Sequence, residues 1–213
     1  YRVISNDVQS YSAVIARSLI GHSPKTRDDF LAAVDPEADL ARAYQENYDR
    51  LARYYEAALE LEADFLKTYE AGRADDSWSV GYREYLRTAA ELYPGVGSGS
   101  IAEPFRSAEP LLRARAGAGD SPACLATTYY SNVYFGLRQS LQIDSLRAAI
   151  EALDERDPWR ESKRTHYLSA LLHAASVSTS GTSHFAQPRH LAKDTELQAM
   201  AGRRLTDIRD SLV

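Results

Sequence analysis

The sequence is poor in the features that mark disulfide-bonded, secreted and membrane-spanning proteins. Cys124 is the single cysteine among 213 residues, so no disulfide can form within the chain. No stretch of about 18 apolar residues could cross a bilayer, and no basic region followed by an apolar stretch, as in a secretory signal, stands near Tyr1. These absences predict a cytoplasmic protein that has no membrane partner.

Positive charge is scarce over most of the chain. Lys and Arg total 25 against 30 Asp and Glu, a net charge of −5 that gives no global attraction to nucleic acid. Residues 35–76 are rich in carboxylates, whereas the last quarter is rich in cations. The sequence therefore predicts that any contact with phosphates lies in that quarter. Its cations are Arg156, Arg160, Lys163, Arg164, Arg189, Lys193, Arg203, Arg204 and Arg209.

Strand-forming runs are also few, and helical patterns dominate. Residues 2–5 form the one β-prone run, and an open α/β sheet would need several. Apolar residues spaced by three or four predict a long amphipathic helix over 36–71, either continuous or broken once. Further helices are expected over 78–93, 101–115, 124–153 (one or two helices), 157–175 and 193–211. The inner faces of the two longest stretches are predicted to be Leu40, Tyr44, Tyr48, Leu51, Tyr55, Leu59, Glu62 and Leu66, and Tyr130, Tyr134, Leu137, Leu141, Leu146 and Ile150.

Two polar residues follow the β-prone run. A carboxylate such as Asp7 at the end of a strand can accept two hydrogen bonds from a ribose diol. Asn6 or Asp7 can equally cap the helix whose apolar residues begin at Val8. Both interpretations stay open on the local pattern.

Two later segments combine residue types that suit DNA. Residues 127–139 hold four aromatic residues beside Arg138, which could stack on bases and contact phosphate, although aromatics at helical spacing are more often core. Residues 176–190 mix hydroxyls with a glycine, an amide and cations, and could approach a DNA backbone or simply connect two helices. A connection of this length is more often functional. Its notable residues are Gly181, His184, Phe185, Gln187 and Arg189.

The order of these segments resembles the Dam-like alpha group of adenine-N6 DNA methyltransferases. The resemblance lies in Asn6-Asp7 after a strand, Tyr134-Phe135-x-x-Arg138, and Gly181-x-x-x-Phe185-x-x-Pro188. Residues 129–150 and 168–188 look similar to a subset of prokaryotic modification methylases. The match covers about residues 1–20 and 124–190, whereas residues 21–123 carry no family signal.

The resemblance implies a mainly α chain, a helical region attached to the edge of an α/β, Rossmann-like fold. It divides the chain into a strand-turn-helix of the cofactor domain (1–22), a helical insertion (23–123) and a helical target-recognition region (124–213). It implies S-adenosylmethionine as cofactor, with Asp7 and Asn6 toward it, and double-stranded DNA as partner in restriction-modification. The residues expected to face DNA are Tyr134, Arg138, Gly181, His184, Phe185, Gln187, Arg189 and Lys193.

The chain departs from the family pattern at two motifs. The family's Phe-x-Gly-x-Gly cofactor loop and its Asp-Pro-Pro-Tyr do not occur in these 213 residues, and neither Glu103-Pro104-Phe105 nor the glycines of 95–100 substitutes for the loop. We therefore expect an internal segment with no catalytic residue of its own. It should be inactive alone, bind S-adenosylmethionine weakly or not at all, and have the remaining portions of the same enzyme as partners. The alternative is a helical protein-interaction module that uses the 36–71 helix.

The histidines and the cysteine point to no further chemistry. His166 and His173 lie seven residues apart, and His184 and His190 follow later, without a cysteine pair or a His-Glu-x-x-His spacing. Structural histidines are therefore expected, and no metal. Cys124 has no identifiable partner base.

Overall fold

The computed structural model describes residue 14 and residues 24–90, 103–114, 123–180 and 193–210. Within these ranges the secondary structure is helical, apart from one isolated bridge between Ser131 and Phe135. The prediction of a mainly α chain is confirmed for this part, while the predicted strand at 2–5 lies outside the described residues. The elements are α2 (Pro24–Ala33), α3 (Pro36–Glu70), α4 (Asp76–Ala90), η1 (Arg106–Ala108), α5 (Glu109–Ala114), α6 (Leu125–Tyr129), α7 (Leu137–Glu151), α8 (Arg160–Ser178) and α9 (Asp194–Arg204).

The long helix α3 is unbroken over its 35 residues. Asp35 caps its start by accepting from the Ala38 amide at 3.1 Å, and Pro36 occupies the first turn, where a missing N–H costs nothing. Gly72 follows its end with φ +67, a conformation that glycine adopts without strain. The predicted inner face is largely confirmed, but Tyr48 and Leu59 are only half-buried. The residues buried on α3 are Leu40, Tyr44, Asn47, Leu51, Tyr55, Ala58, Glu62 and Leu66.

Several helix boundaries differ from the prediction. Within the described residues 103–114, the expected 101–115 helix is reduced to η1 and the short helix α5. The 124–153 stretch forms two helices, and the chain turns between them, so Tyr130 leaves the helical register and is 40% exposed rather than on the inner face. The last helix ends at Arg204 instead of near 211, because the chain bends at residues 205–207 after it.

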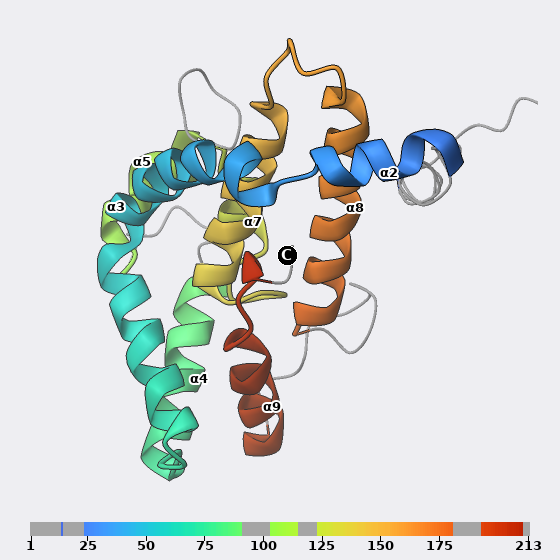
Figure 1. The fold of residues 1–213 in the computed structure, drawn as a ribbon. Helices are drawn as coiled ribbons and strands as arrows, with labels where there is room; N and C mark the ends of the chain where they lie inside the picture. The colour runs from blue at the N-terminus through green and yellow to red at the C-terminus, as the bar shows by residue number, and fades with distance from the viewer. Residues whose placement is uncertain (1–13, 15–23, 91–102, 115–122, 181–192, 211–213) are drawn as a thin grey trace, which may run out of the picture.

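The long helix α3 runs along one side of the described helices (Figure 1), and two clusters of buried side chains join it to the others. One cluster joins the later half of α3 to α4, η1, the start of α7 and α9, and a second joins the start of α3 to the end of α7 and to α8. The helix α3 also packs against α7 and α9 from the later part of the chain. None of the described helices is both long and apolar enough to cross a membrane.

Candidate functional site

Most residues expected to face cofactor or DNA fall outside the described part of the chain. Asn6 and Asp7 do so at one end, and Gly181, His184, Phe185, Gln187 and Arg189 do so in the 181–192 segment. Tyr134, Arg138 and Lys193 are described. The described part of the candidate site therefore consists of the turn that contains Tyr134 and the two chain ends that flank 181–192.

The turn between α6 and α7 is tight. Asn132 adopts φ 60, a left-handed conformation that asparagine tolerates better than most residues. The backbone N–H of Asn132 donates to the Phe135 carbonyl at 2.7 Å, and the backbone N–H of Tyr134 donates to the Tyr130 carbonyl at 3.0 Å. The rings of Tyr130 and Tyr134 meet edge to face with centroids 5.9 Å apart. The turn thus presents a pair of tyrosines, one exposed and one half-buried.

The Tyr134 carbonyl joins this turn to the end of α8. It accepts a hydrogen bond from the Ser180 amide at 2.6 Å and a longer one from the Thr179 hydroxyl at 3.5 Å. The Thr179 carbonyl in turn accepts from the Arg203 guanidinium at 2.6 Å. Two segments that the sequence presents separately, 127–139 and 176–190, are therefore bonded to each other.

The start of α7 is capped by a side chain from α3. Both carboxylate oxygens of Glu62 accept amide hydrogens at the first turn, from Leu137 at 2.8 Å and Arg138 at 2.9 Å. A carboxylate at a helix N-terminus satisfies free N–H groups and interacts favourably with the helix dipole. Gly136 makes this approach possible, because a Cβ there would lie 2.9 Å from Glu62 Oε1.

A buried arginine on α9 lies beside that cap. Arg204 is 1% exposed, and its Nη1 lies 3.8 Å from Glu62 Oε1. The same nitrogen donates to Asn132 Oδ1 at 2.8 Å and to the Tyr82 hydroxyl at 3.2 Å. Burial raises the pKa of Tyr82 to about 12 even though Arg204 lowers it. Tyr82 therefore stays neutral beside the charged pair.

Arg138 is largely engaged within the protein. Its Nη2 donates to the Leu205 carbonyl at 3.1 Å, and its Nη1 lies 3.4 Å from Asp207 Oδ2, so it caps the end of α9. Gln139 strengthens the same junction by donating to the carbonyls of Arg203 and Thr206 at 2.9 and 3.0 Å. A contact between Arg138 and DNA would have to compete with these bonds, and it stays a prediction.

The expected basic surface of the last quarter is smaller than the sequence suggests. Lys163 and Arg204 are buried, and Arg164 and Arg209 pair with Glu151 and Glu37. Lys163 and Arg204 are therefore not available to phosphates, because carboxylates of α3 and of the turn before α8 approach them. That any phosphate contact lies in the last quarter stays a prediction. Lys193, in contrast, is exposed at the start of α9.

No protein-family model matches the chain, and no curated protein or solved structure is detectably similar to it. Its function has to be inferred from its own motifs and contacts.

Sequence reasoning assigned no site role to Glu62, which it placed on the inner face of the long helix. It included Arg204 only among the cations of the last quarter, and it included Asn132 and Ser180 only as members of 127–139 and 176–190. The signal for Glu62 was present, because a carboxylate stood on an otherwise apolar helix face and a buried charge requires a partner. The partners could not be identified, because they are far away in the sequence. Arg204 lies 72 residues from Asn132, and Leu137 and Arg138 lie 75 and 76 residues from Glu62.

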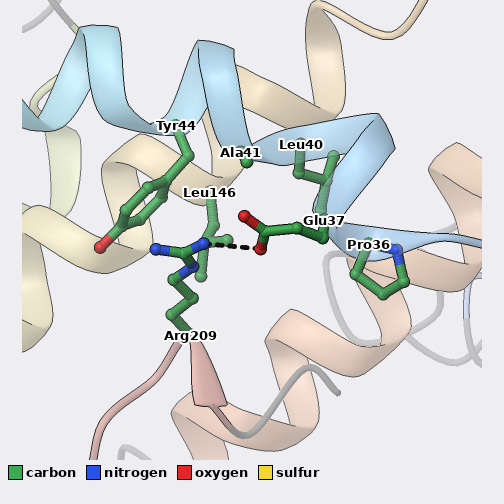
Figure 2. Close-up of a pocket in the computed structure, with 7 residues that line it drawn as sticks. All are labelled: Pro36, Glu37, Leu40, Ala41, Tyr44, Leu146 and Arg209. Carbon is green, nitrogen blue, oxygen red and sulfur yellow. Dashed lines mark hydrogen bonds and ion pairs between the residues drawn. The ribbon is translucent and has the colours of Figure 1, made fainter.

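Two hollows are lined entirely by described residues. Figure 2 shows one beneath the ion pair of Glu37 and Arg209, 2.7 Å apart, where the guanidinium lies 5.2 Å from the centroid of the Tyr44 ring. It holds about 20 Å³, enough for one water and too little for a cofactor. A second, open depression lies between α3 and α4 beside Trp78. Within the described ranges no three His, Cys, Asp or Glu side chains gather as a metal site would require.

Proposed function

We propose that this chain is part of a DNA adenine-N6 methyltransferase and that the turn before α7, the end of α8 and the start of α9 belong to its DNA-facing side. One observation carries the proposal: the 2.6 Å hydrogen bond from the Ser180 amide to the Tyr134 carbonyl. It links Tyr134-Phe135-x-x-Arg138 to the residues that lead directly into Gly181-x-x-x-Phe185-x-x-Pro188. A single DNA-facing site requires such adjacency, whereas two unrelated core segments do not.

The residues have distinct roles in this proposal. Enzymes that modify a base in a duplex first extrude it from the stack, and aromatic side chains can support the extruded base or the neighbours it leaves. Tyr130 and Tyr134 supply aromatic surface at the turn, and Lys193 supplies an exposed cation for phosphate. S-adenosylmethionine would supply the methyl group when bound, and Asp7 and Asn6, outside the described residues, are the proposed contacts to it.

The direct test compares this chain with the full product of its gene. Each protein is incubated with duplex DNA and S-adenosylmethionine, and N6-methyladenine is measured by mass spectrometry. We expect N6-methyladenine from the full protein and none from this chain. A full protein that neither methylates adenine nor binds duplex DNA would overturn the proposal.

Calorimetry tests the cofactor assignment separately. The full protein should bind S-adenosylmethionine, this chain should bind it weakly or not at all, and Asp7→Ala should weaken binding in the full protein. Asp49→Ala, at an exposed position of α3, is the matched control. If Asp7→Ala binds as tightly as the wild type, Asp7 is a helix cap and not a ribose ligand.

The alternative function, a protein-interaction module built on α3, has less to support it. The apolar face on which it depends is already covered by α4, α7 and α9 of the same chain. A partner would have to use the opposite, charged face.

A further inference from the structure

We infer that Glu62 and Arg204 are positioning residues of the proposed DNA-facing site, which they serve by fixing the backbone of residues 132–138 at both ends. The inference rests on the proposed function. It gives a role in the site to α3, which lies in the part of the sequence that carries no family signal.

Glu62 fixes the C-terminal end of the 132–138 segment. Its two carboxylate oxygens each accept one amide, from Leu137 and Arg138, so the first turn of α7 is tied to α3 at two points. The residue before that turn, Gly136, has no side chain with which to cap the helix. Gln139 Oε1 accepts from the Gly136 amide at 3.0 Å, but the amides of Leu137 and Arg138 depend on a carboxylate 75 and 76 residues earlier.

Arg204 fixes the N-terminal end of the 132–138 segment. Its hydrogen bond to Asn132 Oδ1, at 2.8 Å, holds the one non-glycine residue of the described chain that has a positive φ. Such a conformation persists when surrounding contacts impose it. The turn therefore depends on a guanidinium 72 residues later.

The charged groups of Glu62 and Arg204 also lie close to each other. Arg204 Nη1 lies 3.8 Å from Glu62 Oε1, and the aliphatic part of Arg204 packs over Gly136, where a Cβ would lie 3.2 Å from Arg204 Cγ. Buried ion pairs often add little to stability compared with apolar residues of similar size, and their best attested use is to select one arrangement. Here the selected arrangement is that of the turn.

Tyr134 lies between the two fixed ends, and its carbonyl accepts from Ser180. If either end is released, the carbonyl shifts and the bond to Ser180 weakens. The aromatic turn and the end of α8 then lose their mutual placement, which DNA binding requires.

The test uses three variants of the full gene product. Glu62→Gln keeps the size but places an amide donor against a backbone N–H. Asn132→Gly accepts the positive φ readily but removes the acceptor for Arg204, whereas Asn132→Asp keeps an acceptor there. Glu46→Gln, exposed on the same helix, is the control.

We expect Glu62→Gln and Asn132→Gly to raise KM for duplex DNA by roughly tenfold or more, the scale expected of a misplaced contact. KM for S-adenosylmethionine should not change, and Asn132→Asp and Glu46→Gln should resemble the wild type. A merely structural role would instead move both KM values together, or neither, and either result overturns the inference. If Glu62→Gln does not fold, Asn132→Gly decides.

Hydrogen exchange separates this inference from the proposed function. If the wild-type protein methylates no DNA, the proposed function fails, yet the amide of Ser180 should still exchange faster in Glu62→Gln than in Glu46→Gln. Equal protection of that amide in the two variants shows that Glu62 does not position the turn.

Discussion

Asp144 lies in the interior where α7 meets α6, and it caps a helix other than its own. Its carboxylate accepts from the amides of Ala126 and Thr127 at 2.8 and 2.7 Å and from the Thr127 hydroxyl at 2.7 Å. Burial raises the pKa of Asp144, and these hydrogen bonds oppose that rise. The five-residue helix α6 has no side-chain cap at Cys124, so Asp144 supplies the cap.

Asp144→Asn should therefore destabilise the fold. The amide can accept at one oxygen only and must turn its NH₂ toward a donor, a loss of about 1–3 kcal/mol for a buried group left unsatisfied. Urea denaturation measures the free energy of unfolding, with Asp49→Asn at an exposed site as control. Equal midpoints for the two variants would show that Asp144 is not a cap of consequence.

Lys193 is the described cation best placed for phosphate. Lys193→Ala combined with Arg189→Ala should weaken binding of the full protein to all duplexes similarly and lower the salt dependence by roughly one unit per lost contact. His184→Ala and Gln187→Ala should alter sequence preference or turnover and leave the salt slope unchanged. Fluorescence anisotropy at several salt concentrations measures both. Lys67→Ala, exposed on α3, is the control, and a slope unchanged by the double substitution would make 181–192 only a connection.

At the site, residue types could be predicted and partners could not. Arg138 was predicted to face DNA because it stands beside aromatic residues. Its guanidinium contacts residues at the end of α9, 66 to 69 positions away in the sequence. Lys163 and Arg204 count as positive charge in the sequence, whereas the fold neutralises both with carboxylates. Pairing across such separations depends on packing, which local pattern does not contain.

At the scale of elements, one buried lysine joins two helices and the turn between α7 and α8. The Lys163 ammonium on α8 lies 2.8 Å from Asp39 of α3 and 2.8 Å from Asp157 of the turn, and the Tyr167 hydroxyl also donates to Asp39. Burial lowers the pKa of Lys163, but the bonds to Asp157 and Asp39 outweigh it and raise that pKa above 10.5. The hydrogen bond from Lys163 likewise lowers the pKa of Asp157 below 3.8.

Lys163→Met should separate these elements and change the acid stability. We expect a loss of about 3 kcal/mol near neutral pH, because two carboxylates lose their counterion. Because the pKa of Asp157 is lowered in the folded protein, the ionised carboxylate stabilises the fold above pH 3.8. This stabilisation disappears as the pH falls through the pKa of Asp157 in the folded state. The difference in melting temperature between Lys163→Met and the wild type should therefore become smaller in strong acid. Thermal melts across acid and neutral pH measure it, with Lys67→Met as control, and a constant difference would contradict it.

The elements themselves follow the sequence where local signals agree. The long helix α3 has a cap, a proline and a largely apolar face, and its extent was predicted, although one break was left open. The split between α6 and α7 was left open, because their caps, Asp144 and Glu62, come from other helices. The end of α9 was placed too late because nothing local marks the bend after Arg204.

For the whole molecule, buried tyrosines set an alkaline limit. Burial raises the pKa of Tyr44, Tyr55, Tyr82, Tyr85 and Tyr167, and that of Tyr82 reaches about 12. In the unfolded chain tyrosine titrates near pH 10. A raised folded pKa means that the stability is present below about pH 10 and is lost as the pH rises toward the folded values.

We therefore expect alkaline unfolding in which buried tyrosines ionise together with the loss of helix. Tyrosinate absorbance and circular dichroism, followed on one sample as pH rises, should show a common transition after the exposed tyrosines have titrated. Complete ionisation of all 14 tyrosines near pH 10 with helix content intact would contradict the burial described here.

The caps supplied from distant helices have a consequence for the order in which the protein is made. The turn at 130–136 needs Glu62, synthesised long before it, and Arg204, synthesised long after it. Translation delivers residues in sequence, and contacts with distant segments form late. On the ribosome, the tyrosine turn can acquire its final shape only after α9 has emerged from the exit tunnel, so a nascent chain halted before residue 204 holds α3 without a finished turn.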